Sequence, residues 1–407
     1  MAQQDDFAPT EALVDAPAQH QPRQTLDIRF TGSGSEYFRI WIVNLLLTLV
    51  TFTLYVPFAR ARRIAYFQNN TLVGGDPLGF HADPRKMFRG YLLILLLGVG
   101  YWAVTNFVPG MEWVALAVFM LLWPALWRAS LQFRLLNTSW RGVRLSFQGD
   151  LLSAYLSLLP FFLPALAFVL FLPAGQEGEQ VAPDEVRRGM QVIGITVLVF
   201  VALLPWLLAR IKRYQHGGYA FAQERTQLRV GNGRFYLLFL KTGLVSLLVG
   251  VLAAALLFAV FFLVMGGQNG VRAVLIGAVR PGVLGLVLLA TGAGLAYLLL
   301  PLVTLPYFGA RLQNLSWSGT QSPKIAFASA LRFRDLFRVT LVNWLLIIVT
   351  LGLYWPFAKV RTARVKLEAL SLEVQGPVDQ WLSRAQQSHK GLLGDAAGDF
   401  FGMDMGL

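Results

Sequence analysis

The chain has 407 residues, of which 56% are hydrophobic and only 14% charged, well below the roughly 25% of soluble domains. It contains no cysteine, which excludes disulfides, thiolate metal sites and cysteine nucleophiles. The formal net charge is +13. Since no nucleic-acid recognition motif accompanies this charge, we assign the excess to Lys and Arg in the cytoplasmic loops of a membrane protein, without nucleic-acid binding.

The polar residues 1–25 predict a disordered cytoplasmic tail, because they contain three prolines and little apolar content. They have neither the basic start nor the apolar core of a secretory signal. A strand is expected at Leu26–Phe30, followed by a helix N-terminus at Ser35 and Glu36. From there a single membrane domain is expected to occupy residues 26–376, and residues 377–407 read as a cytoplasmic, partly disordered tail.

One stretch occurs twice. Residues Phe38–Arg62 return, 299 positions later, as Phe337–Arg361, and the similarity extends over residues 36–67 and 335–366. The identical pairs include Phe38/Phe337, Arg39/Arg338, Asn44/Asn343, Thr51/Thr350, Tyr55/Tyr354, Pro57/Pro356 and Arg62/Arg361. Two copies at the ends of the domain indicate an internal repeat, whose units usually bury the same face in the same way.

The same residues carry a family resemblance. Gly32-x-Gly34-x-Glu36-Tyr37-Phe38, Asn44, the Thr–Leu–Tyr–x–Pro–Phe–Ala segment, Asn69-Asn70-Thr71 and the Gly-rich end to Leu407 are similar to the YjgN-like family of bacterial inner-membrane proteins. The resemblance covers nearly the whole chain. It implies a multi-pass inner-membrane protein of unknown function and supplies no catalytic residues.

Between the copies, apolar spans of about 20 residues form three helix pairs, at residues 88–128, 151–209 and 236–307. Nearly all the Arg and Lys residues fall in the long connections between these pairs, which are therefore expected to be cytoplasmic. The connections at Pro109–Glu112, Ala174–Gly189 and Gly266–Gly282 are expected on the far side. Short strand-like runs near Phe147 and Phe327 predict small β elements in a thin layer under the membrane.

Each terminal copy presents a conflict, because both of its flanks are basic and look cytoplasmic. Either each copy is a re-entrant hairpin, broken at residues 51–54 and 350–353, or each crosses the bilayer. We favour the hairpins, since Pro57 and Pro356 fit the first turn of a new helix and the following cations avoid the membrane core. The expected fold is thus an all-α multi-pass membrane protein with small cytoplasmic β elements, six full transmembrane helices and two short re-entrant hairpins; eight transmembrane helices is the alternative.

Few residues invite a functional role. The six spans contain no Asp, Glu or His in their cores, and the four histidines have no metal-ligand spacing, so we expect no enzyme, metal or cofactor. The candidate ligand or pore contacts are Asn44, Thr51, Tyr55, Asn343, Thr350 and Tyr354, although bonding within the protein is the simpler role for the asparagines. The candidate contacts to anionic lipid headgroups are Arg39, Arg62, Arg338 and Arg361.

Three functional classes remain. The first is a transport or channel-like protein, in which the two copies line a polar path. The second is a membrane scaffold that binds lipids or partners through its basic cytoplasmic layer. The third, a lipid-acting enzyme, is the least favoured because no catalytic constellation is present. A water-filled cavity lined by Asn44, Asn343, Thr51 and Thr350 would favour transport, and a closed interior would favour the scaffold.

Overall fold

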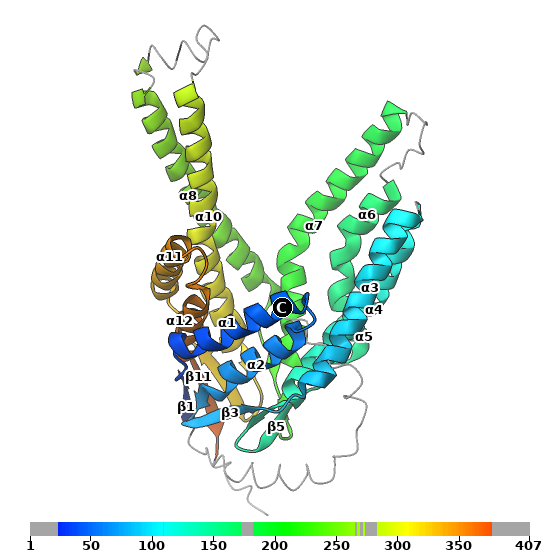
Figure 1. The fold of residues 1–407 in the computed structure, drawn as a ribbon, viewed down its shortest axis with the longest axis vertical. Coiled ribbons are helices and arrows are strands. Elements are labelled where there is room, and N and C mark those ends of the chain that lie inside the picture. Colours follow the sequence, from blue (N-terminus) through cyan, green and yellow to red (C-terminus); the bar gives the residue numbers. More distant parts are fainter. Residues whose placement is uncertain are drawn as a thin grey trace, which may run out of the picture.

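The computed structural model describes residues 23–108, 110–171, 182–264, 267–268, 272 and 283–376. Both predicted tails lie largely outside these residues, as do most of the connections expected on the far side of the membrane. A layer of strands lies at one end of the molecule, and the long helices rise from it (Figure 1).

The helices come in pairs along the chain. They are α1 (Gly34–Val50), α2 (Val56–Asn69), α3 (Pro84–Phe107), α4 (Glu112–Leu136), α5 (Leu151–Leu158), η1 (Leu159–Phe162), α6 (Leu163–Phe171), α7 (Pro183–Gly217), α8 (Asn232–Val264), α10 (Val283–Ser318), α11 (Phe333–Val349) and α12 (Trp355–Glu368). Six helical segments within the described chain are long and apolar enough to cross a membrane: Pro84–Phe107, Trp113–Leu136, Leu151–Phe171, Pro183–Gly217, Asn232–Val264 and Ala290–Ser318. Neither terminal copy is among them.

A short strand or hairpin follows each helix pair. The strands are β1 (Arg23–Phe30), β2 (Thr71–Val73), β3 (Asp76–Phe80), β4 (Thr138–Trp140), β5 (Val143–Phe147), β6 (Tyr219–Phe221), β7 (Glu224–Arg225), β8 (Gln227–Leu228), β9 (Thr320–Gln321), β10 (Ile325–Ser329) and β11 (Leu370–Gln375). Two-residue loops with positive φ join β2 to β3 at Gly74-Gly75 and β4 to β5 at Arg141-Gly142, as tight hairpins require.

The eleven strands within the described residues form one antiparallel sheet, in the order β7-β6-β5-β4-β3-β2-β1-β11-β10-β9-β8. The first and last strands of the chain pair with each other, with Leu26 opposite Leu372. The two sheet edges, β7 and β8, are separated in sequence only by Thr226, whose N–H donates to the Tyr219 carbonyl at 2.8 Å. The sheet therefore curls into a nearly closed barrel in which strands follow one another in chain order.

Apolar side chains fill the inside of this barrel. Alternate residues of β1 and β11 point inward, and the buried cluster comprises Leu26, Ile28, Val73, Trp140, Val143, Ile325, Leu370, Leu372 and Val374. Alternation with period two is what a strand with one buried face requires. The interior is a packed core, as in small barrels whose lumen is filled by side chains.

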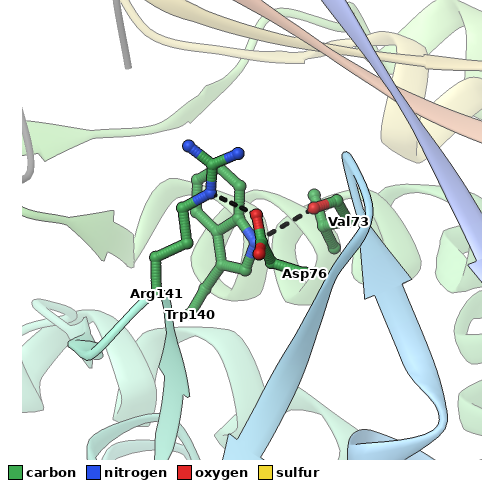
Figure 2. Close-up of polar contacts among 4 residues, drawn as sticks. All are labelled: Val73, Asp76, Trp140 and Arg141. Atoms are coloured by element: carbon green, nitrogen blue, oxygen red, sulfur yellow. Dashed lines mark hydrogen bonds and ion pairs between the residues drawn. The ribbon is translucent and has the colours of Figure 1, made fainter. Parts of the chain in front are cut away.

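Trp140 connects the β2–β3 hairpin to the β4–β5 hairpin at this core (Figure 2). Its indole N–H donates to the Val73 carbonyl at 3.1 Å, which satisfies a buried donor. The guanidinium of Arg141 lies 5.1 Å from the Trp140 ring and contacts the Asp76 carboxylate at 2.5 Å. These contacts link the β2–β3 turn to the β4–β5 turn.

The predicted fold class, all-α with small β elements in a thin layer, is therefore wrong. The strands near Phe147 and Phe327 are real, but they belong to an eleven-stranded, nearly closed barrel with its own core. Isolated two-stranded hairpins are marginal in water, and in this sheet each hairpin pairs with at least one neighbouring strand. The pairing of β1 with β11 joins segments more than 300 residues apart, which no local pattern could indicate.

The helices repeat the circular arrangement of the strands. Successive helices contact one another from α1 to α12, and α12 returns to contact α1. Away from the sheet, α8 and α10 form one pair and α3 to α7 another group, and the two diverge (Figure 1). Most large apolar side chains on these outer segments are exposed, as expected where lipid surrounds the helices.

Candidate functional site

Both terminal copies are helical hairpins, α1–α2 and α11–α12. The expected break is present, because α1 ends at Val50 and α2 begins at Val56, while α11 ends at Val349 and α12 begins at Trp355. A 17-residue helix is about 25 Å long, shorter than a hydrocarbon core of about 30 Å.

The two threonines close these turns. Thr51 donates its hydroxyl to the Leu47 carbonyl at 2.7 Å and accepts the N–H of Tyr55 at 3.0 Å. Thr350 does the same with Leu346 and Tyr354, at 2.6 and 2.9 Å. The predicted ligand contacts at Thr51 and Thr350 are thus engaged in satisfying backbone groups freed at the helix ends.

The two asparagines hold each hairpin together from inside. Asn44 donates to the Ala59 carbonyl at 3.5 Å, and Asn343 donates to the Ala358 carbonyl and the Thr362 hydroxyl, both at 3.2 Å. Only 7% of Asn44 and 4% of Asn343 are exposed. Each bonds within its own hairpin. The side-chain oxygens of both have no hydrogen-bond partner, so both sites hold a buried, unsatisfied acceptor.

The hairpin tips are apolar and strained. Phe52 and Leu351 have φ of 47° and 48°, a left-handed conformation that glycine usually occupies at a helix C-terminus. The two residues are 89% and 94% exposed. Flanking apolar residues are exposed too: Leu46, Leu49, Val50 and Leu54 in the first hairpin, and Leu345, Ile348, Val349, Leu353 and Trp355 in the second. Strain that presents large apolar side chains in this way points to an apolar environment around the tips.

The first tip lies beside α3. The hydroxyl of Tyr91 donates to the Thr53 hydroxyl at 3.0 Å. Tyr91 is seven residues into α3, so the tip lies about 10 Å along this helix from its first residue. Interfacial helices bury their apolar face by about 5–10 Å, and the tip falls near that depth if α3 enters the membrane at its N-terminus.

The two copies pack against each other through α1 and α12. The rings of Phe38 and Phe357 lie 5.6 Å apart, and a guanidinium N–H of Arg364 donates to the Gly32 carbonyl at 2.8 Å. Gly34 is needed at this contact, because a Cβ there would lie 2.4 Å from the Phe357 ring. The structure thus joins two segments that are 299 residues apart into one body.

Arginines and a lysine lie along the hairpins. The Arg62 guanidinium lies 5.7 Å from the Tyr55 ring, and Arg361 donates to the Tyr354 hydroxyl at 3.0 Å. The predicted headgroup contacts Arg39, Arg62 and Arg338 are exposed, and Arg361 is half-buried. Burial, and then the charge of Arg63, lower the pKa of Lys359. The first hairpin therefore places a cation close enough to a lysine of the second to disfavour its charge, which an anion between them would offset.

A polar pocket was not singled out from the sequence. It has a volume of about 370 Å³ and lies between α5 and α7. Its lining residues include Asp150, Ser153 and Ser157 from the α5 side, Trp206, Arg210, Arg213 and Tyr214 from α7, and Arg225 from β7. The available signal was the spacing of Trp206, Arg210, Arg213 and Gly217, which places four residues on one face of a helix at the end of an apolar run.

Among the described residues, no group of three or more His, Asp or Glu side chains is placed to hold a metal ion. Buried His216 contacts the Thr320 hydroxyl through Nδ1 at 2.8 Å, and Thr226 donates to the His216 carbonyl at 2.5 Å. These bonds connect the end of α7 to β9 and to the residue between β7 and β8, so this histidine has a structural role where the sheet nearly closes.

Comparison with known proteins places this arrangement in a family. The model of the family described as "Bacterial protein of unknown function (DUF898)" matches residues 25–400. The chain belongs to this family. The Salmonella typhimurium "Inner membrane protein YjgN" is 25% identical over 359 residues, covering 86% of this chain and 88% of the relative. The Escherichia coli O157:H7 protein of the same name is 29% identical over 144 residues, or 34% of each chain. No solved structure matches.

The matches confirm the family resemblance recognised in the terminal motifs. The DUF898 match begins within β1 and runs past β11, so it includes both strands that close the ring between the chain ends. The relatives are named as inner membrane proteins, and the six long apolar helices of this chain have the length and composition that such a location requires.

Proposed function

We propose that this protein is a lipid-binding scaffold of the bacterial inner membrane. Its two re-entrant hairpins insert their apolar tips into one leaflet, and the Arg and Lys residues at the other end of each hairpin bind anionic headgroups. The barrel and the long basic connections would then lie on the cytoplasmic side. The observation that carries the proposal is the pair of strained, almost fully exposed apolar residues at the two tips, Phe52 and Leu351.

The charges of the hairpins support this assignment. Cations lie behind each apolar tip: Arg39, Arg60, Arg62 and Arg63 in the first copy, and Arg338, Lys359, Arg361 and Arg364 in the second. Juxtamembrane cations attract anionic headgroups by about 1 kcal/mol each. Burial, and then the charge of Arg63, lower the pKa of Lys359, so an anion bound between these two cations would stabilise the charged form of Lys359.

The alternative is transport through a polar path between the copies. The side chains that would line such a path are engaged elsewhere: Asn44 and Asn343 bond the returning helix of their own hairpin, and Thr51 and Thr350 close the turns. The barrel beneath is filled with apolar side chains. These observations favour the scaffold over a channel.

Depth measurements test the membrane part of the proposal. Single cysteines at Phe52 and Leu351 can be spin-labelled without background, because the chain has none of its own. In lipid nanodiscs both labels are expected to be accessible to oxygen and shielded from a water-soluble relaxation agent. A label at exposed Arg144, on the barrel, is the control and is expected to show the reverse. Tip labels that are open to the water-soluble agent would overturn the proposal.

Lipid selectivity tests the headgroup part. Spin-labelled phosphatidylglycerol and phosphatidylcholine are compared in the lipid shell around the full-length protein. The double variant Arg63→Gln/Lys359→Gln is expected to lower the preference for phosphatidylglycerol. The control removes two cations elsewhere: Arg187 and Arg188 are exposed near the N-terminus of α7, and Arg187→Gln/Arg188→Gln is expected to leave the preference unchanged. Equal preferences in the two variants would contradict the role of the hairpins.

A further inference from the structure

We propose that the pocket between α5 and α7 binds the phosphodiester of a single phospholipid headgroup. This deepens the proposed function and rests on it only for the membrane setting. Three guanidinium groups, of Arg210, Arg213 and Arg225, line the pocket together with one carboxylate, that of Asp150. An excess of guanidinium over carboxylate suits a phosphate, because guanidinium donors match phosphate oxygens in pairs.

The arginines are held in place by other parts of the protein. Arg213 donates through one terminal nitrogen to the Val230 carbonyl at 3.0 Å and to Asn232 at 2.5 Å. Arg225 donates through Nε to the Gly217 carbonyl at 2.8 Å. A guanidinium has five N–H donors, so these bonds orient each group and leave donors for a ligand. Arg210 lies 4.9 Å from the Trp206 ring, which supports it from one side.

The position of the pocket favours a lipid over a free phosphate. Trp206 and Arg210 stand where the apolar run of α7 meets its basic end. Aromatic residues and cations occupy this level at the membrane surface, where lipid phosphates lie. Ile195 and Val199 lie on the same face of α7 as Trp206 and Arg210, further along its apolar run, and both are exposed. A lipid seated by its phosphate here would have apolar surface available for its acyl chains.

Asp150 would contact the headgroup alcohol that is esterified to the phosphate, and so distinguish one headgroup from another. It is the N-cap of α5 and accepts the N–H of Ser153 at 2.8 Å. This bond is the main reason that the pKa of the Asp150 carboxyl is lowered, so the group is charged at neutral pH. A carboxylate beside a bound phosphodiester accepts from an ammonium more strongly than from a hydroxyl. The pocket therefore favours an ethanolamine headgroup over a glycerol headgroup.

Native mass spectrometry of the full-length protein in detergent tests the site. The protein is titrated separately with phosphatidylethanolamine, phosphatidylglycerol and inorganic phosphate. One phospholipid per chain is expected to bind more tightly than the rest, and Arg210→Gln is expected to weaken it by about ten- to hundredfold. Arg144→Gln makes the same charge change on the exposed barrel surface and is expected to have no effect. Equal binding by the two variants would overturn the proposal.

Two further arms identify the ligand. Inorganic phosphate at millimolar concentration is expected not to displace the lipid; displacement would show that the site takes free phosphate and would overturn the lipid assignment. Asp150→Asn keeps an N-cap residue and removes the charge, so it is expected to weaken phosphatidylethanolamine relative to phosphatidylglycerol. An unchanged ratio would overturn the placement of the headgroup beside Asp150. The bound lipid is counted as one stoichiometric adduct, whereas the hairpins are assessed from the surrounding lipid shell, so either proposal can fail without the other.

Discussion

The two terminal hairpins have nearly the same backbone conformation but differ in the side-chain hydrogen bonds that join their two helices. Their helix C-caps, Thr51 and Thr350, have φ of −94° in both copies and ψ of 14° and 12°. The next residues, Phe52 and Leu351, have φ of 47° and 48°. The bonds that close the two turns also correspond one to one. The repeated residues therefore define one turn geometry, which tolerates changes in other side chains.

The interiors differ at positions where the copies diverge in sequence. Asn343 bonds both the Ala358 carbonyl and the Thr362 hydroxyl at 3.2 Å, whereas Asn44 has a single bond of 3.5 Å to Ala59. The position that matches Thr362 is Arg63 in the first copy. The second hairpin is thus closed by a short polar network, and the first has a cation in its place. From this difference we expect the second hairpin to open less readily than the first.

A charge introduced at Asn44 or at Asn343 should give the largest difference in stability between the two hairpins. Asn343→Asp places a carboxylate against the Ala358 carbonyl with no donor to its free oxygen, and it is expected to cost about 3–5 kcal/mol. Asn44→Asp is expected to cost less, because Arg63 stands at the position of Thr362 and can supply a counter-charge. Thermal unfolding in detergent gives the overall ranking. Thiol labelling of cysteines introduced at the buried, matched positions Ala61 and Val360 reports the opening of each hairpin.

The control is Asn343→Leu, which removes both hydrogen bonds and the unsatisfied oxygen together without adding charge. It is expected to cost only about 1 kcal/mol. If Asn343→Asp and Asn343→Leu open the hairpin equally, the buried charge is not the cause. If Asn44→Asp is the more damaging of the two charged variants, the assignment of Arg63 as a counter-charge is wrong.

Exchanging Thr53 and Gly352, the residues that follow Phe52 and Leu351, should have an intermediate effect on the stability of the hairpins. Thr53 and Gly352 have φ of 72° and 93°, a region that a β-branched residue adopts only under strain. Gly352→Thr is expected to destabilise the second hairpin by about 1–3 kcal/mol, and Thr53→Gly to relieve strain in the first by up to about 1 kcal/mol. Labelling at the same two cysteine positions measures both. A Thr53→Gly variant that opens more readily would show that the Tyr91 bond to the Thr53 hydroxyl outweighs the strain.

The hairpins were predictable because their signals are local. Short apolar helices, Thr and Gly at the break, Pro57 and Pro356 after it, and basic flanks all lie within 25 residues of one another. The repeat then allowed the two copies to be compared directly. The hydroxyls of Thr51 and Thr350, which the sequence suggested as ligand or pore contacts, bond the carbonyl four residues earlier, and this contact also depends on local geometry alone.

The barrel was not predictable in the same way. Its strands have only two to eight residues, and their partners come from different helix pairs. One motif illustrates the difficulty: Ser139-Trp140 and Ser316-Trp317 match in sequence, yet Trp140 lies in β4 and Trp317 in α10. Both rings contribute to the same core, so tertiary packing decided the local structure. The α5–α7 pocket was missed for a related reason, because Arg225 reaches it from β7, whose position depends on the barrel.

The smallest expected effect distinguishes the copies by their response to alkaline pH. In the first hairpin the Tyr66 hydroxyl donates to the Ser33 carbonyl at 2.8 Å and to Glu36 at 3.3 Å, and the matched position in the second hairpin is Val365. Burial first, and then the charge of Glu36, raise the pKa of Tyr66 to about 12. In the unfolded chain this pKa is about 10, so the folded state favours the protonated hydroxyl. The stabilisation is complete below about pH 10 and is lost as the pH rises toward 12.

Tyr66→Phe should therefore lower the unfolding temperature modestly at pH 8, with a difference from the native chain that shrinks between pH 10 and 12. Tyr236→Phe is the control, because Tyr236 on α8 is 42% exposed, and it should show no such convergence. A constant difference between Tyr66→Phe and the native chain up to pH 12 would mean that the hydroxyl contributes by packing alone, and that alkaline pH acts on both hairpins alike.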